Sequence, residues 1–317
     1  MDRKLDELLY ALMQNMMIAV SGEKLARDLG VSHSTLARWI EKLRDAGIEI
    51  LGELFTGYRL VRLPDVILPQ LLRPRLRTAE FGKTLYHFYS VDSTNAFAAR
   101  LLAHSHNVAE GTLVIAESQT AGRGRLGRNW LSEREAGLYC SIVLFPKAPP
   151  SLAPLFTLGA AVAMHNAIER YTRLALDIKW PNDLLVDGKK VCGILAEIQA
   201  EVDLVKTMII GVGVNVNHEC FPSEIEDRAS SLRIASGRMQ SRIEILLEFL
   251  EEFENLYLDF ERKGPQRIIE QWTRLSSFAN GRKIEINDGV RKISGLTRGL
   301  NPLGALRVEV DPAGRHV

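Results

Sequence analysis

Apolar residues in the first 63 positions recur at the spacing of short helices. One face of the first predicted helix carries Leu5, Leu8, Leu9 and Leu12. Two further helical segments follow, and Gly30 and Gly47 are placed to end them. Residues Ile48–Val61 then read as two strands that turn at Thr56-Gly57. Three helices followed by a hairpin predict a winged helix-turn-helix domain over residues 1–63.

The third of these helices has two distinct faces. Its apolar face carries Leu36, Ile40 and Leu43. Its polar face carries Ser34, Arg38 and Lys42, in the place where a recognition helix meets DNA. The segment holds nine basic and nine acidic residues, so DNA binding would have to come from this local arrangement. The alternative is a structural three-helix module that binds another protein.

A proline-rich stretch at residues 64–78 predicts a linker with a short turn of helix, and we place a domain boundary near Pro64. Arg73, Arg75 and Arg77 fall within this stretch. These arginines suit either a nucleic-acid contact or a solvated linker face.

Mixed patterns between Phe81 and Leu275 predict a domain of strands and helices. Strands are expected at Thr112–Glu117, Leu138–Leu144, Lys190–Ile198 and Leu204–Val216. Helices are expected at Thr94–His104, Ser151–Tyr171 and Ile243–Lys263. Because several strands follow one another without a helix between them, the sheet should be antiparallel or mixed and the fold class α+β. We assign residues 64–275 to this domain.

The apolar run from Ala148 to Ile168 is long enough to raise the question of a membrane span. Three prolines interrupt its first third, and His165 and Asn166 lie near its end. We therefore expect a buried core helix and no membrane association.

Short alternating segments fill the tail, residues 276–317. They cover residues 282–287, 290–298 and 305–310, with glycine and proline between them. This arrangement predicts a small β-barrel at the end of the chain.

Composition indicates the cellular compartment and the class of binding partner rather than the activity. Forty basic residues against 39 acidic ones leave no global field that would attract nucleic acid. The three cysteines, Cys140, Cys192 and Cys220, form no CxxC pair and are odd in number, so free thiols in a reducing cytoplasm are expected. Charges in the first ten residues fall where a secretory signal would have its apolar core, so no export is expected.

The run GRGRLGRNW at Gly122–Trp130 combines glycines with three arginines directly after a predicted strand. Formally it satisfies the GxGxxG dinucleotide pattern, but no helix follows, and Leu144–Lys147, about 20 residues on, contains no acid for a ribose. A flexible cationic loop is the better interpretation, because its glycines permit close backbone approach and its guanidinium groups can hold carboxylate and phosphate. Such a loop could order around an anionic ligand.

The run KWPND at Lys179–Asp183 lies between two predicted strands. We expect the Lys179 side chain to be directed inward and held; a salt bridge to a nearby acid is the alternative. Asn182-Asp183 could either coordinate Mg²⁺ or shape the turn. No histidine spacing supports a zinc site, and no GxSxG elbow supports Ser-His-Asp catalysis.

Together, the two runs resemble the active site of biotin protein ligases, and the amino-terminal segment narrows the resemblance to the bifunctional type that also represses the biotin operon. The resemblance implies three domains: a winged helix-turn-helix, a central domain related to class II aminoacyl-tRNA synthetases, and an SH3-like barrel. It also implies an enzyme that makes biotinyl-5'-adenylate from biotin and MgATP. The acceptor would be a lysine of the biotin carboxyl carrier protein of acetyl-CoA carboxylase.

The resemblance also carries site residues. The residues that it implies for biotin binding are Ser93, Thr94, Asn95, Gln119, Arg123, Gly124, Arg125, Lys179 and Gly193. Those that it implies for adenylate or ATP binding are Arg125, Arg128, Trp130, Asn182 and Asn215, and Asp183 is the candidate ligand of Mg²⁺. Catalysis would rest on Lys179, Arg123, Arg125 and Arg128, through alignment and charge neutralisation. The family often has arginine where this chain has Leu126, which removes one charge from the loop.

Operator DNA and a ligand-promoted homodimer are the further partners that this resemblance implies. Two other functions remain open from the sequence. One is a lipoate ligase, which shares the chemistry but not the GRGR loop followed by KWPND. The other is a transcription factor whose ligase-like domain only senses a small molecule.

Overall fold

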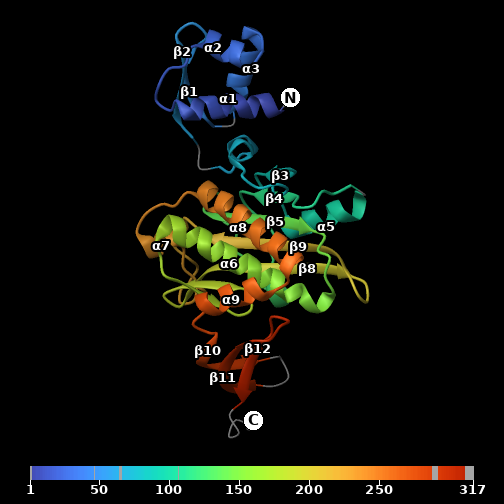
Figure 1. Cartoon of the computed structure of the whole chain (residues 1–317). Coiled ribbons are helices and arrows are strands. Elements are labelled where there is room, and N and C mark those ends of the chain that lie inside the picture. The colour runs from blue at the N-terminus through green and yellow to red at the C-terminus, as the bar shows by residue number, and fades with distance from the viewer. Residues whose placement is uncertain (1, 46, 64–65, 106, 288–291, 311–317) are drawn as a thin grey trace. The chain divides into compact units, whose positions relative to one another are not determined.

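A computed structural model describes residues 2–45, 47–63, 66–105, 107–287 and 292–310 (Figure 1). The chain divides into two compact units, Met1–Leu76 and Arg77–Val317. Most of the linker expected at residues 64–78 falls inside the first unit, which therefore extends beyond the expected domain boundary near Pro64.

The first unit contains the predicted helices and hairpin. Its elements are α1 Asp2–Gln14, α2 Gly22–Asp28, α3 His33–Asp45, β1 Glu49–Glu53 and β2 Gly57–Arg62. The apolar faces expected from the spacing are buried, with Leu8, Leu36 and Ile40 at 0% exposure. The two strands pair antiparallel, and their turn lies at residues 54–56. The winged helix-turn-helix prediction is confirmed for this unit.

The linker forms α4 Pro69–Leu72 and a 3-10 turn at Arg73–Arg75, in agreement with the predicted turn of helix. Arg73 Nη1 lies 3.4 Å from Asp6 Oδ2 on α1. Arg77 Nη1 lies 3.7 Å from Glu251 Oε2. These two arginines therefore pair with acids of the protein itself.

A seven-stranded sheet forms the centre of the second unit, in the order β3-β4-β5-β9-β8-β7-β6. Its strands are β3 Leu85–Phe88, β4 Leu113–Ala116, β5 Gly137–Leu144, β6 Leu176–Lys179, β7 Asp183–Val186, β8 Lys189–Ala200 and β9 Val205–Asn215. Only the β3–β4 pair is parallel among these neighbours, and the other pairs are antiparallel. The predicted mixed sheet and the α+β class are confirmed.

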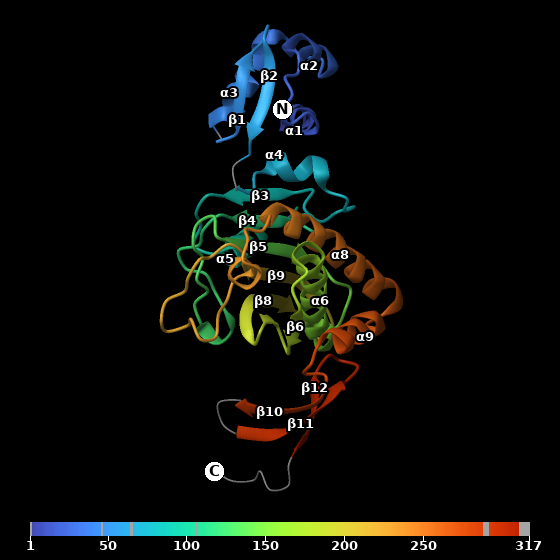
Figure 2. The same cartoon turned by 90° about the vertical axis from the view of Figure 1, so that its left-hand side faces the viewer.

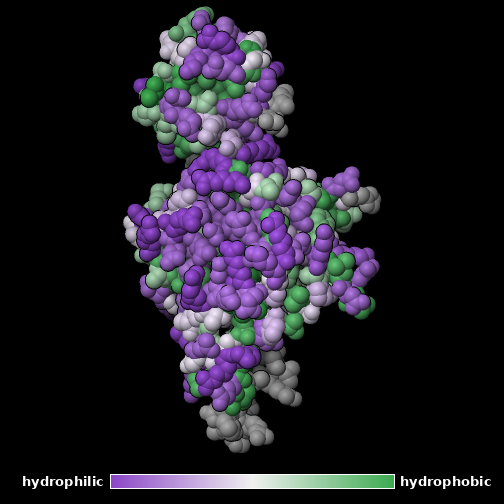
Figure 3. Space-filling view, viewed as in Figure 1, coloured by the Kyte–Doolittle hydropathy of each residue, from purple (hydrophilic) through white to green (hydrophobic). Residues whose placement is uncertain are grey.

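Helices cover both faces of this sheet (Figures 1 and 2). They are α5 Thr94–His104, α6 Ala153–Thr172, α7 Leu232–Ser236, α8 Arg242–Lys263 and α9 Gln266–Leu275. Ala98 of α5 packs on one face against Val114, Val143 and Ile209. On the other face α6 and α8 lie together, and Figure 3 shows that the surface over them is largely hydrophilic. Their apolar sides therefore face the sheet.

Residues 150–172 are long and apolar enough to cross a membrane by composition, but 78% of the most apolar window is buried inside the unit. Burial of this extent is what a core helix requires. The prediction of a buried helix at Ser151–Tyr171 is confirmed.

Three strands end the described chain: β10 Asn280–Asn287, β11 Lys292–Leu300 and β12 Leu306–Val310. They form one small antiparallel sheet in the order β10-β11-β12. Residues 290–291 of the predicted middle segment lie outside the described residues. Trp180 Nε1 donates to Gly304 O at 3.1 Å, which ties this sheet to the turn after β6.

Candidate active site and DNA-facing helix

A cavity of about 1820 Å³ opens beside β8 and β9, and every candidate ligand-binding residue predicted for the central domain lines it. These residues are Ser93, Thr94, Asn95, Gln119, Arg123, Gly124, Arg125, Arg128, Trp130, Lys179, Asn182, Asp183, Gly193 and Asn215. Pockets for one drug-sized ligand usually measure roughly 300–1,000 Å³. The cavity therefore has room for two small molecules side by side.

The start of α5 forms one end of the cavity. Ser93 is the N-cap residue, and its Oγ accepts from Ala96 N at 3.4 Å. Thr94 N donates to Gln119 Oε1 at 2.8 Å, and Ser141 Oγ lies 2.8 Å from Thr94 Oγ1. These buried polar groups satisfy one another, so the end of the cavity is held in one geometry.

Asn95 extends this network across the sheet. Ser141 Oγ donates to Asn95 Oδ1 at 2.6 Å, while Asn95 Nδ2 donates to Glu197 Oε2 at 3.2 Å. A Cβ on Gly211 would lie 2.1 Å from Asn95 Oδ1. Position 211 must therefore be glycine for Asn95 to occupy this place.

Trp130 lies over a floor made of glycine. Gly193 of β8 and Gly213 of β9 are paired neighbours, and a Cβ on either would approach the indole to 2.8 Å or 2.4 Å. The indole Nε1 is buried and has no hydrogen-bond partner among the described residues. The missing side chains leave a flat surface on which a ring can lie against the backbone.

The glycine-rich loop folds into a compact turn above this floor. Gly124 N donates to Arg128 O at 2.6 Å, and Leu126, at φ 57°, is almost fully exposed. Arg123 Nη1 lies 3.4 Å from Glu197 Oε1, and Arg125 Nη1 donates to Asn182 Oδ1 at 3.3 Å. The arginines thus reach the cavity from one loop, with weak contacts that an anionic ligand could replace.

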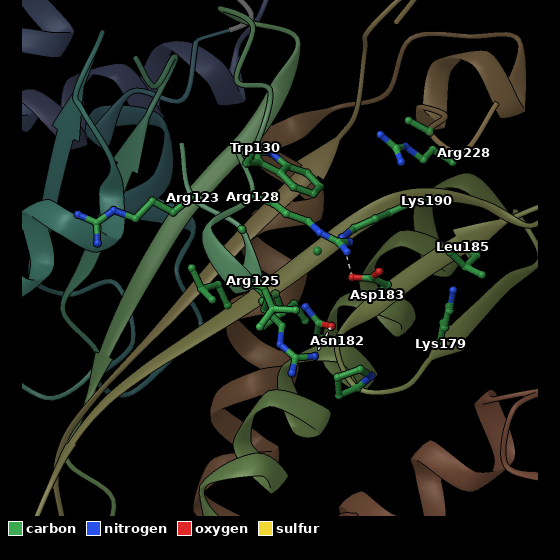
Figure 4. Close-up of a pocket in the computed structure, with 18 of the residues that line it drawn as sticks. Arg123, Arg125, Arg128, Trp130, Lys179, Asn182, Asp183, Leu185, Lys190 and Arg228 are labelled. Carbon is green, nitrogen blue, oxygen red and sulfur yellow. Dashed lines mark hydrogen bonds and ion pairs between the residues drawn. The ribbon is translucent and has the colours of Figure 1, made fainter. Parts of the chain in front are cut away.

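The environment of Lys179 in the structure differs in part from what the sequence predicted. Lys179, at the end of β6, is exposed and makes no hydrogen bond or ion pair with another described residue. It lines the cavity, as an inward-directed side chain would, but no described residue holds it, and the alternative of a salt bridge is not found among the described residues. Lys179 ends the edge strand β6, and Figure 4 shows its ammonium group toward Leu185, which also lines the cavity.

Lys190 occupies the place that the sequence analysis expected of Lys179. Its Nζ lies 2.7 Å from Asp183 Oδ1 and 5.2 Å from the centre of a Trp130 ring (Figure 4). The β7–β8 pairing brings it there, since Asp183 pairs with Gly193 and Leu185 with Lys190. The adjacent Lys189-Lys190 pair was visible in the sequence, but their orientation depends on strand register.

A second loop that the sequence analysis did not assign also lines the cavity. Between β9 and α7, the chain contributes Phe221, Ile225, Arg228 and Ala229. Lys190 N donates to Arg228 O at 2.8 Å, and Ser230 N donates to Lys190 O at 3.0 Å. This segment has neither helical nor strand periodicity, so no sequence pattern pointed to it.

Asp183 and Asn182 were the candidates for a metal ion. Among the described residues no group of three or more histidine, cysteine, aspartate or glutamate side chains could hold a metal. Mg²⁺ needs less than this, because one carboxylate, several waters and substrate phosphates complete its shell. Asp183 fits that role if the ion replaces the Lys190 ammonium beside it.

In the first unit, Ser34, Arg38 and Lys42 are all exposed on α3, opposite the buried Leu36, Ile40 and Leu43. They stand four residues apart, so they form one stripe along the helix. This is the arrangement that a recognition helix requires to reach base edges.

Two family models match this chain, one in each unit. Residues 87–215 match the model of the biotin/lipoate A/B protein ligase family, and residues 4–59 match that of a helix-turn-helix domain. The chain is 39% identical to a bifunctional ligase/repressor of Bacillus spizizenii over 88% of its length and 85% of that protein. It is 29% identical to the bifunctional ligase/repressor of Escherichia coli, over 92% of the chain and 88% of that protein.

A solved structure shares the fold of the second unit. The biotin protein ligase of Aquifex aeolicus, in complex with biotin and ATP, is 32% identical, with a TM-score of 0.62. The match covers 73% of this chain and 97% of that one.

Proposed function

This chain belongs to the biotin/lipoate A/B protein ligase family, among its bifunctional ligase/repressors, and we propose that it biotinylates a carboxylase and represses transcription. It is an ATP-dependent, AMP-forming biotin protein ligase, and it works in the cytoplasm. Its acceptor is a lysine on the biotin carboxyl carrier protein of acetyl-CoA carboxylase. The observation that carries the ligase half is the convergence of cations from two separate segments on one glycine-floored cavity.

Biotin binds at the α5 end of the cavity, where Ser93, Thr94, Asn95 and Gln119 form a buried polar network. The bicyclic head of biotin offers a ureido group, which needs donors and acceptors placed in this fixed way. ATP binds beside it, on Trp130, Asn182 and Asn215 and beneath Arg125 and Arg128. Arg123, Gly124, Lys179 and Gly193 border the place where the two ligands meet.

In the first half-reaction the biotin carboxylate oxygen attacks the α-phosphorus of ATP, the bond to the bridging oxygen breaks, and pyrophosphate leaves. In the second, an acceptor lysine amine attacks the biotinyl carbonyl, loses a proton, and AMP leaves. No side chain of the enzyme has to act as a nucleophile. The enzyme lowers the barrier by alignment and by neutralising charge.

Two anions must meet in the first step, so positive charge at the meeting point matters most. Arg123, Arg125 and Arg128 supply it from the loop, and Lys179 supplies it from the end of β6. We add Lys190 to this set, because its ammonium lies inside the cavity beside Trp130. Mg²⁺ held by Asp183 would neutralise further charge on the phosphates when bound.

DNA binding belongs to the first unit, through Ser34, Arg38 and Lys42. One short recognition helix in a charge-balanced domain makes few phosphate contacts, so two copies on a two-fold symmetric operator bind usefully where one does not. We propose that bound adenylate promotes this homodimer, which makes operator occupancy respond to biotin supply.

Incubating the protein with ATP and either biotin or lipoate, while following pyrophosphate release, tests the ligase half. Release with biotin alone supports the proposal. Release with lipoate alone would assign a lipoate ligase, and release with neither would leave a ligand-sensing transcription factor.

A further inference from the structure

Two loops line the part of the cavity that we propose for ATP. The ends of these loops lie close together where β5 begins and β9 ends. The first, between β4 and β5, carries the arginines and Trp130. The second, between β9 and α7, carries Phe221 and Arg228. Figure 4 shows Trp130 and Arg228 toward the same end of the site, with Lys190 between them.

The buried phenol group of Tyr139 lies between the ends of these two loops. Tyr139 Oη donates to Glu133 O in the first loop at 3.0 Å, and lies 3.3 Å from Nε2 of His218 at the start of the second. Tyr139 and His218 are 0% and 1% exposed. A Cβ on Gly137 would lie only 2.2 Å from Tyr139 Oη, so the glycine is what lets the phenol reach this place.

The hydrogen bonds between these groups have one direction. The Tyr139 hydroxyl has a single proton, and the Glu133 carbonyl can only accept it, so His218 Nε2 must be the donor to Tyr139 Oη. His218 Nδ1 is buried with no hydrogen-bond partner among the described residues, as a bare ring nitrogen can be. Burial, aided by the nearby Arg242, lowers the pKa of His218 to about 4, so the ring is neutral. The chain runs from His218 through Tyr139 to Glu133.

His218 also reaches the cavity through its ring. Its imidazole stacks on Phe221, with ring centres 5.3 Å apart and planes 20° from parallel. Its carbonyl accepts from Ser231 Oγ at 2.7 Å, at the far end of the same loop. The orientation of Phe221 at the cavity wall therefore depends on the histidine that Tyr139 holds.

We infer that Tyr139 and His218 are positioning residues that couple the two loops, so that ordering one loop around the adenylate orders the other. Neither residue lines the cavity, so both act through other groups. The inference rests on the proposed adenylate-forming function. The hydrogen bonds from His218 through Tyr139 to Glu133 would then help to retain biotinyl-adenylate in the cavity.

A double-mutant cycle in the full chain tests it. Tyr139→Phe removes only the hydroxyl, and His218→Phe removes the donor while keeping a ring to stack on Phe221. We expect each variant to speed dissociation of biotinyl-adenylate roughly three- to tenfold, because each breaks the hydrogen bond between His218 and Tyr139, and one neutral hydrogen bond has about this effect. Because both break the same chain, the double variant should dissociate no faster than the faster single variant.

Tyr257→Phe is the matched control, since its buried hydroxyl lies 3.2 Å from Glu110 Oε2, away from the cavity. It should change adenylate dissociation less than twofold. Biotin affinity without ATP should stay unchanged in all variants, which a general structural defect would not allow. If one tyrosine variant fails to fold, His218→Phe alone still decides the matter.

Effects that multiply in the double variant, or unchanged dissociation in folded single variants, would overturn the coupling. Wild-type protein that forms no adenylate would instead refute the proposed function on which the inference rests.

Discussion

At the scale of single residues, the cavity is defined by cations that have few partners of their own. Lys179 is exposed and unpaired among the described residues, and the side chain of Arg128 is exposed and makes no hydrogen bond or ion pair with any of them. Lys190 and Arg123 are paired with Asp183 and Glu197, at 2.7 Å and 3.4 Å. The unpaired charges of Lys179 and Arg128 and the long contact of Arg123 leave these groups available to phosphate and carboxylate when such ligands arrive.

Lys179→Ala should slow adenylate formation by about 10²-fold, because it removes one donor that offsets the repulsion between carboxylate and phosphate. Its exposure predicts little change in thermal stability. Biotin-dependent exchange of pyrophosphate into ATP measures the rate. Lys189→Ala is the control, since this lysine points to Glu226 O at 2.9 Å and does not line the cavity. Near-normal exchange in a folded Lys179→Ala protein would refute the role.

Arg125→Ala should shorten the lifetime of bound adenylate, because the loop loses a guanidinium that can hold the phosphate. A charge-assisted contact of this kind is worth about 1.5–3 kcal/mol, or roughly 10- to 150-fold in dissociation rate. Release of radiolabelled adenylate measures it. Arg134→Ala, outside the cavity and 64% exposed, is the matched control. Equal dissociation rates for wild type and Arg125→Ala would show that this arginine does not retain the intermediate.

The sequence predicted these residues because glycine and arginine alternate in a way that few other sites need. It could not place Lys190, because a one-residue change in the β7–β8 register would move that side chain to the other face. The structure has a register shift there, between Leu184 and Leu185. Tyr139 and His218 carry no sequence signal at all, since they are 79 residues apart and meet only in the folded sheet.

At the scale of elements, one buried ion pair fastens α8 to the sheet. Arg242 Nη1 donates to Glu117 Oε2 at 2.8 Å and to Gly137 O at 3.0 Å, and both charged side chains are fully buried. The pair stands directly behind the first loop, at the end of β4 and the start of β5. It therefore supports the base from which the loop extends.

Arg242→Leu should lower the free energy of unfolding by roughly 3–5 kcal/mol, because it leaves the Glu117 carboxylate buried without its guanidinium. Urea denaturation measures the change. Lys263→Ala at the other end of α8 removes a lysine that is 75% exposed and lies 2.9 Å from Asp259; because Arg267 also pairs with Asp259, the denaturation midpoint should stay unmoved. A loss of stability no larger than that of the control would contradict this role.

Elements with a cap and a long apolar face were predictable. The bounds of α5 match the prediction, because Ser93 caps it and its apolar side is continuous. The short strand β3 and helix α9 were not predicted as separate elements. Four residues are too few to show a period of two, and α9 follows α8 after only two residues. Their positions depend on packing against the sheet and on α6.

At the scale of the whole molecule, the repressor half predicts that ligand changes DNA affinity. Adding biotin and ATP should tighten binding to the promoter of the organism's own biotin genes by about 5- to 150-fold, the usual range of coupling between sites. Gel-shift titration measures this. Arg38→Ala should weaken binding by on the order of 1–3 kcal/mol if that side chain reads a base, without altering adenylate formation. If biotin and ATP leave the DNA affinity unchanged, the proposed biotin-responsive repressor function is wrong.

Biotin transfer to protein tests the central claim most directly. The full chain, MgATP and biotin are incubated with a biotin carboxyl carrier domain, and the intact mass of that domain is measured. We expect its mass to rise by one biotinyl group on one lysine, only when ATP is present. An unchanged mass with biotin, or a lipoyl group added when lipoate replaces it, would contradict the claim.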